Sequence, residues 1–172
     1  DLPGLDDTGF STHPFAALAA LEVVSEGYQV SLMAPTEVLA KQHFEKFCQL
    51  FKNYNFHIAL LTNSYKLTTC SENINRSKLL TEISGGKINL VIGTHALIQK
   101  DVEFKNLALI IIDEQHRFGV AQRAYLQQDA MQIKDGERKT IPHLLTLTAT
   151  PIPRTLAIAF SGNLDISLLD EM

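Results

Sequence analysis

The sequence predicts an α/β fold in which a largely parallel sheet lies between two layers of helices. Short apolar runs recur along the chain, and they are almost continuously apolar, as expected of strands covered on both faces. Helical patterns separate these runs, which predicts strand–helix–strand units with right-handed crossovers. The expected strands are residues 28–35, 56–62, 88–94, 107–113, 143–150 and 165–170.

Helices are expected in the intervals between these strands. An Ala- and Leu-rich stretch predicts a helix over 15–26, and another helix is expected over 120–128. A third is expected through 77–84, with Asn75 or Arg76 as its N-cap. The remaining helix, 36–51, has Thr36 as a plausible N-cap and one apolar stripe made of Leu39, His43, Phe47 and Leu50 or Phe51. The polar stretch 134–140 is expected to be a solvated loop.

Bulk properties exclude several classes of protein. The 172 residues suit one domain with a sizeable core, and the net charge of -4 argues against a globally basic, histone-like nucleic-acid binder. Cys48 and Cys70 lack metal-site spacing, so a reduced, cytoplasmic setting is expected. No apolar run reaches the roughly 18 residues of a membrane span, and no signal-peptide pattern begins the chain.

Polar groups follow the expected strands at the point where each strand ends. Ligands of open α/β sheets bind outside the carboxyl ends of the strands. The candidate site residues are therefore Pro35–Thr36, Gly93–Thr94–His95, Asp113–His116 and Thr148–Thr150.

The stretch LALIIIDEQH, residues 107–116, carries the most chemistry. Asp113 can hold Mg²⁺ that bridges nucleotide phosphates, and Glu114 can orient or deprotonate an attacking water. Gln115 and His116 follow in the loop, where they can contact a γ-phosphate or a neighbouring segment. The alternative is a strand that simply ends in a solvated turn.

Hydroxyl groups mark the other strand ends. Thr148 and Thr150 can hydrogen-bond the DEQH loop and relay its state, and the alternative is an ordinary turn. Thr36, together with the free N–H groups of its helix and Lys41, suits a nucleic-acid phosphate; the alternative is a plain cap. Gly93 and Thr94 follow the same logic, whereas His95 is more typical of a packed or turn histidine.

Four segments resemble, in order and spacing, the first motor lobe of RecG-type DNA helicases. They are APTEVLAKQH, GTHALIQ, IIIDEQHRFGVAQR and LTLTATPIPRTLA, and the resemblance runs from about Phe15 to Asp170. It implies a RecA-like, P-loop NTPase fold of helicase superfamily 2, with ATP and Mg²⁺ as cofactors. It also implies ATP-driven translocation on branched DNA, such as forks and junctions, in repair and recombination.

The resemblance also implies roles for individual residues. Asp113 and Glu114 match the Mg²⁺-binding and water-activating acids, and His116 matches a residue that couples the nucleotide to DNA-bound segments. Thr148 and Thr150 match the motif that couples the two motor lobes. The positions that match contacts with the DNA backbone are Pro35, Thr36, Gly93 and Thr94.

One segment departs from the family pattern. The family has a phosphate-binding loop of the form GDVGSGKT where this chain has residues 6–13, and only Asp7 and Gly9 agree. Thr12 stands in place of the lysine, and His13 replaces the Mg²⁺-binding hydroxyl. Gly9, Thr12 and His13 are therefore positions of a degenerate nucleotide loop, and ATP binding by this chain is in doubt.

The residues before that loop make a poor strand. DLPGLDD, residues 1–7, contains a proline, a glycine and three aspartates, so the first strand of the sheet is expected to be missing or irregular and to leave a gap between neighbours. We divide the chain into an irregular N-terminal segment, 1–14, and a motor lobe, 15–172. The abrupt change suggests a truncated, frameshifted or altered N-terminus.

Two functional hypotheses follow. Family members carry a wedge domain and a second motor lobe, which do not fit in 172 residues, so the first hypothesis is a helicase fragment with little ATPase activity of its own. The alternative is a non-catalytic nucleic-acid-binding or scaffolding remnant. An unrelated P-loop-like hydrolase is disfavoured, because the guanine-reading Asn-Lys-x-Asp motif is absent and the DEQH motif fits helicases better.

Overall fold

The computed structural model describes residues 13–69, 74–113 and 142–147. Their elements, in chain order, are α1 (His13–Ser25), β1 (Gln29–Met33), α2 (Glu37–Leu50), β2 (Ile58–Leu61), β3 (Lys66–Thr68), α3 (Arg76–Ser84), β4 (Leu90–Gly93), the 3₁₀ helix η1 (His95–Ile98), β5 (Leu107–Asp113) and β6 (His143–Leu147). The helix expected over 120–128, the loop over 134–140 and the strand over 165–170 lie outside these residues.

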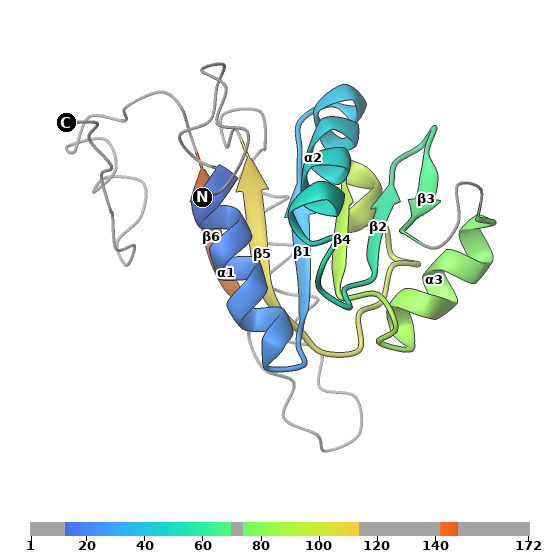
Figure 1. The fold of residues 1–172 in the computed structure, drawn as a ribbon. Helices are drawn as coiled ribbons and strands as arrows, with labels where there is room; N and C mark the ends of the chain where they lie inside the picture. The colour runs from blue at the N-terminus through green and yellow to red at the C-terminus, as the bar shows by residue number, and fades with distance from the viewer. Residues whose placement is uncertain (1–12, 70–73, 114–141, 148–172) are drawn as a thin grey trace, which may run out of the picture.

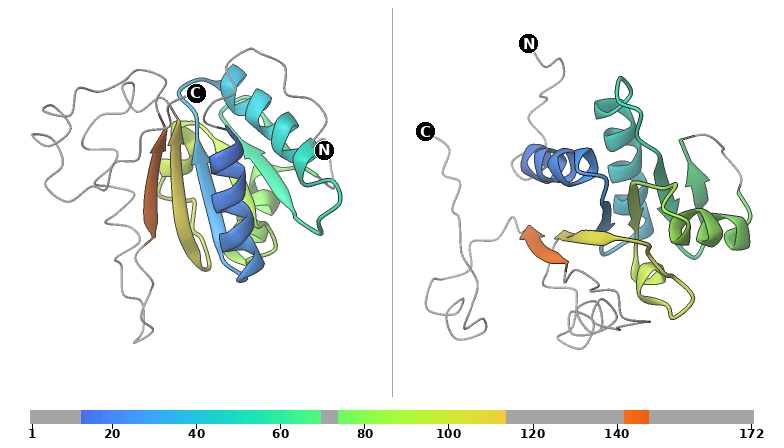
Figure 2. Two further views of the ribbon diagram at one scale, coloured as in Figure 1. Left: turned by 60° about the vertical axis from the view of Figure 1, so that its left-hand side comes forward. Right: turned by 90° about the horizontal axis from the view of Figure 1, so that it is seen from below.

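The six described strands form one sheet in the order β3-β2-β4-β1-β5-β6. All neighbouring pairs are parallel except β2 and β3, which are antiparallel. Helices α1 and α2 cover one face of the sheet, and α3 and η1 pack against the other (Figures 1 and 2). The predicted three-layer α/β architecture is thereby confirmed.

Each face of the sheet contributes alternate side chains to its own core. Val30 and Leu32 of β1 pack with α1 and α2, while Met33 belongs to the cluster that includes Leu79 and Ile83 of α3. Because residues of both parities are buried along β1, the strand reads as a continuous apolar run. This is the physical basis of the strand predictions.

Helix α2 begins where the sequence predicted. The Thr36 hydroxyl accepts a hydrogen bond from the backbone N–H of Leu39, as an N-cap does. The alternative left open at the end of the apolar stripe is resolved in favour of Phe51, which is buried, whereas Leu50 is 47% exposed. Asn75 caps α3 in the same way, with Arg76 as its first helical residue.

The expected gap in the sheet does not fall between any of the described strands, and residues 1–7, from which it was predicted, lie outside the described part of the chain. The six described strands are hydrogen-bonded to one another without interruption, so a further strand would have to add at an outer edge, beside β3 or β6. Strand β6 occupies such an edge and is only half-buried, which its apolar run did not indicate. Neither β3 nor η1 was expected, because three or four residues are too few for periodicity to show.

A buried glutamine ties together the amino-terminal ends of the strands. Gln29 opens β1 and is 2% exposed. Its amide nitrogen donates to the carbonyls of Ile83 and Ile88, at 2.9 and 2.8 Å. Its amide oxygen accepts from the N–H groups of Lys105 and Asn106, at 2.8 and 3.2 Å. One side chain thus joins α3, the segment before β4 and the segment before β5.

Candidate nucleotide and nucleic-acid site

The carboxyl ends of the strands bring the described candidate residues to one edge of the sheet. Met33 pairs with Gly93 on one side and with Ile112 on the other, so β1, β4 and β5 end at the same level. The N–H of Ala34 donates to the carbonyl of Gly93 at 2.9 Å, which fixes the start of the next segment. The segments that begin at Pro35 and Thr94 therefore leave the sheet close to Asp113.

Asp113 is the last residue of β5, and its side chain is 11% exposed. The imidazole Nε2 of His43, on α2, lies 2.8 Å from Asp113 Oδ2. A carboxylate oxygen only accepts hydrogen bonds, so the imidazole donates from Nε2. The His43 side chain is 4% exposed, which makes this a buried contact between residues 70 positions apart in the sequence.

The chemistry of Asp113 fits one role in a Mg²⁺–nucleotide site. Mg²⁺ is commonly held by one or two carboxylates, with phosphates and waters completing its shell, rather than by an all-protein cage. Within the described part of the chain, no group of three or more His, Cys, Asp or Glu side chains gathers to hold a metal ion. A single carboxylate at a strand end therefore suits a nucleotide-borne cation better than a structural metal.

The N-terminus of α2 presents a capped but still available hydroxyl. Thr36 Oγ1 accepts from Leu39 N at 3.3 Å and keeps its own hydrogen for donation to another oxygen. Glu37 follows, and its carboxylate accepts from Ser64 N at 3.0 Å. Hydrogen bonds from the Ser64 side chain and backbone lower the pKa of Glu37 below its usual 4.5. Lys41, one turn on, lies 3.9 Å from a Glu45 oxygen and over the ring of Tyr65.

Gly93 is required by packing within the sheet. A Cβ atom at this position would lie 2.1 Å from the backbone oxygen of Leu61 and 2.9 Å from Leu97 Cγ. The sequence predicts close approach by a ligand at this glycine; in the structure strand β2 approaches it, and contact with a ligand stays a prediction. Thr94 comes next as the N-cap residue of η1, and its hydroxyl makes no capping hydrogen bond to that turn.

The other candidate residues lie outside the described part of the chain. They are Gly9, Thr12, Glu114, Gln115, His116, Thr148 and Thr150. The backbone of His13 begins α1. Leu147 pairs with Asp113 in the sheet, so the Thr148–Thr150 segment follows directly from the strand position beside the acid.

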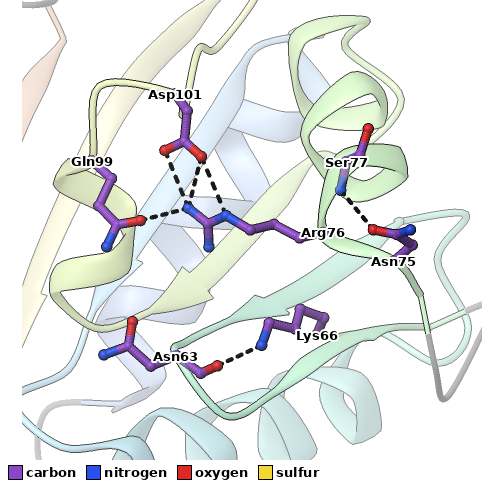
Figure 3. A network of polar contacts seen from close by, with 7 residues as sticks. All are labelled: Asn63, Lys66, Asn75, Arg76, Ser77, Gln99 and Asp101. Carbon is purple, nitrogen blue, oxygen red and sulfur yellow. Dashed lines mark hydrogen bonds and ion pairs between the residues drawn. The ribbon is translucent and has the colours of Figure 1, made fainter.

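Two polar contacts were missed by the sequence interpretation, one at the site and one on α3. The sequence places His43 on the apolar stripe of α2 and does not predict its contact with Asp113. The one available signal is that a polar histidine stands among the apolar residues Ala40, Phe44 and Phe47. The second contact joins α3 to the segment after η1 (Figure 3). Arg76 donates to both carboxylate oxygens of Asp101, at 3.0–3.2 Å, and to Gln99 Oε1 at 2.6 Å.

Comparison with known proteins identifies the family. The sequence profile of the DEAD/DEAH box helicases matches residues 14–158, which include every described strand. The chain belongs to the DEAD/DEAH box helicase family. Within this family, the resemblance to the first motor lobe of RecG is confirmed by the relatives and structures that follow.

The chain is 46% identical over 166 residues to the ATP-dependent DNA helicase RecG of Aquifex aeolicus, and 45% identical to that of Bacillus subtilis. Each match covers 96% of this chain but only 19% and 22% of the relative. The chain thus spans about a fifth of the length of these helicases. Within the described residues, no helix is long and apolar enough to cross a membrane.

Solved structures agree with the family and with the RecA-like fold. A structure of RecG bound to a three-way DNA junction superposes with a TM-score of 0.64 at 40% identity, and it covers 86% of this chain and 17% of that one. Dbp5 of S. cerevisiae superposes with a TM-score of 0.62 at 17% identity, which shows the fold only, over 96% of this chain and 40% of that one. The predicted α/β fold is therefore the RecA-like fold of a helicase motor lobe.

Proposed function

We propose that this chain is the first motor lobe of a RecG-like helicase that couples ATP hydrolysis to movement on branched DNA. The observation that carries the proposal is the convergence of Asp113, Thr36 and Thr94 at one edge of the sheet. A nucleotide-binding acid and two backbone-binding hydroxyls then lie on adjoining segments. The RecG structure mentioned above holds a DNA junction, which supports DNA as the partner.

In this proposal the acidic end of β5 serves the nucleotide. Asp113 would hold Mg²⁺, which when bound to ATP neutralises phosphate charge, and Glu114 would orient the attacking water. Gln115 and His116 would contact the γ-phosphate and DNA-bound segments, while Thr148 and Thr150 would pass the nucleotide state to a second motor lobe. These roles rest on the DEQH and TAT sequences and on the position of β6 beside β5.

The segments that follow β1 and β4 at the same edge of the sheet would bind the nucleic-acid backbone. The hydroxyls of Thr36 and Thr94 and the N–H groups at the start of α2 would donate to phosphate oxygens. We expect Thr36→Val to weaken the binding of forked DNA about threefold to tenfold, and Thr36→Ser to retain it, as measured by fluorescence anisotropy at fixed salt. Thr81→Val, on an exposed part of α3, is the matched control.

The proposal includes low ATP turnover by this chain. The loop at 6–13 lacks the lysine and hydroxyl that stabilise transferring phosphate, a loss worth several kcal/mol of transition-state stabilisation. A phosphate-release assay with ATP, Mg²⁺ and forked DNA measures this directly. Turnover that is robust and lost in Asp113→Asn would contradict the proposed inactivity while supporting the role of the acid.

The altered loop also favours a second candidate, a non-catalytic nucleic-acid-binding lobe. The two candidates differ in whether nucleotide affects DNA binding. We expect ATP with Mg²⁺ to change the affinity for a fork in a motor lobe. Fork binding that is equal with and without nucleotide supports the non-catalytic candidate instead.

A further inference from the structure

Helix α2 connects the two halves of the proposed site. Thr36 caps its first turn, and His43 lies seven residues further on, about two helical turns along the same element. At that point the His43 imidazole is 2.8 Å from the Asp113 carboxylate. A single rigid element therefore contacts the nucleic-acid side of the edge at one end and the acid of β5 part-way along.

His43 differs from every other buried position of α2. The helix buries Ala40, His43, Phe44 and Phe47 against the sheet, so the other three buried side chains are apolar. A polar side chain in such a place costs free energy unless it forms a hydrogen bond. The bond to Asp113 offsets that cost, and it restrains the carboxylate through one of its two oxygens.

We propose that His43 is a positioning residue that fixes the Asp113 carboxylate and links it mechanically to the DNA-facing end of α2. The inference rests on the proposed function, because it assigns Asp113 to a divalent cation and Thr36 to DNA. Residues that orient a ligating carboxylate typically change metal affinity 10- to 100-fold when they are replaced. A displacement of α2 on DNA binding would reach Asp113 through the same hydrogen bond.

The first test measures the cation without requiring catalysis. Mn²⁺, as a paramagnetic substitute for Mg²⁺, is supplied as its complex with ATP, the 172-residue chain is titrated into it, and binding is followed by the change in the electron paramagnetic resonance spectrum of the complex. Binding that disappears in Asp113→Asn defines the specific site. We expect His43→Leu to weaken this binding about tenfold. His43→Gln should retain most of it, because the glutamine amide nitrogen can also donate to Asp113.

A matched control separates positioning from loss of stability. Gln29→Leu removes buried hydrogen bonds at the other end of the sheet and should lower stability while leaving the Mn²⁺ affinity unchanged. Undiminished Mn²⁺ binding in His43→Leu would overturn the positioning role of His43 and leave the proposed function intact. Absence of Asp113-dependent binding in the unaltered chain would instead overturn the proposed role of Asp113, and the inference with it.

The second test measures the link to DNA. The Mn²⁺ affinity of the unaltered chain is compared with and without a saturating forked oligonucleotide, and we expect a change of threefold or more. In His43→Leu the ratio should fall to about one, while the fork still binds. A ratio that is the same in both proteins would contradict coupling through His43, and failure of the fork to bind either protein would contradict the DNA contact at Thr36.

Discussion

Two buried polar side chains, at opposite ends of the sheet, satisfy their hydrogen bonds in different ways. Gln29, at the amino-terminal end, bonds four backbone groups that belong to three segments. Among the described residues, Asp113, at the carboxyl-terminal end, accepts a hydrogen bond from the side chain of His43. The glutamine side chain holds backbone segments together, whereas the carboxylate is oriented by a side chain through one of its two oxygens. The buried polar group at the amino-terminal end therefore stabilises the fold, whereas the one at the carboxyl-terminal end is suited to binding a ligand.

The largest effect is expected at the structural end. Gln29→Leu removes four buried hydrogen bonds to two carbonyls and two N–H groups, of which the Ile83 carbonyl keeps its bond from Gly86 N, so the free energy of unfolding should fall by about 3–5 kcal/mol. Urea denaturation followed by circular dichroism measures this change. Gln49→Leu, on an exposed position of α2, should change stability by less than about 0.5 kcal/mol. Equal effects of the two variants would remove the distinction between the ends of the sheet.

The second-largest loss of stability is expected where β2 and β4 approach each other at Gly93. Gly93→Ala places a methyl group against the backbone oxygen of Leu61, which cannot move without disturbing the sheet, so stability should fall by about 2–3 kcal/mol. Gly27→Ala meets open space and should cost about 1 kcal/mol, because its φ of 82° is unfavourable for alanine. Thermal denaturation of both variants checks the order.

The contact that distinguishes the binding end should have an intermediate effect on stability. His43→Leu removes the buried hydrogen bond to Asp113, whereas Gln29→Leu removes four, and we expect the free energy of unfolding to fall by about 1–3 kcal/mol. In the double variant with Asp113→Leu, part of this loss should be recovered, because neither polar group is then left buried without the other. Strictly additive losses in a double-mutant cycle would show that the two side chains do not interact.

Thr36, the N-cap of α2, lies at the carboxyl-terminal end of the sheet, where binding is proposed, and it also contributes to folding. Thr36→Ala removes the acceptor for Leu39 N and should lower the free energy of unfolding by about 1 kcal/mol. Thr36→Ser restores the cap and should restore stability. If Thr36→Ala left urea denaturation unchanged, the hydroxyl would have no role as a cap.

The smallest effect is a pH dependence beside that cap. The pKa of Glu37 is lowered in the folded chain, so its carboxylate stabilises the fold above its unfolded pKa of 4.5, and this contribution is lost as pH falls through the lower folded value. The difference in stability between the unaltered chain and Glu37→Gln should therefore be present at neutral pH and vanish in strong acid. A difference that grew as the pH was lowered would contradict the sign.

Local patterns were sufficient for elements whose burial decides their composition. The run at 107–113 coincides with β5 because its neighbours cover it on both sides, and Thr36 and Asn75 cap helices through bonds to residues only two or three positions away. The half-exposed state of β6 could not be predicted in this way, because position in the sheet is not encoded in the strand itself. Roles proposed for Glu114, Gln115, His116, Thr148 and Thr150 remain predictions.

The sequence by itself determined the α/β class, the positions of most helices and strands, and the family, because these depend on periodicity, capping and motif order. Only the tertiary structure decided that His43 faces Asp113 and that Gln29 joins three segments, since both involve partners more than 50 positions away. It also decided that position 93 needs a glycine, because a Cβ atom there would collide with the backbone oxygen of Leu61. Side chains far apart in the chain meet only once strand order and register are fixed, and no local pattern specifies either.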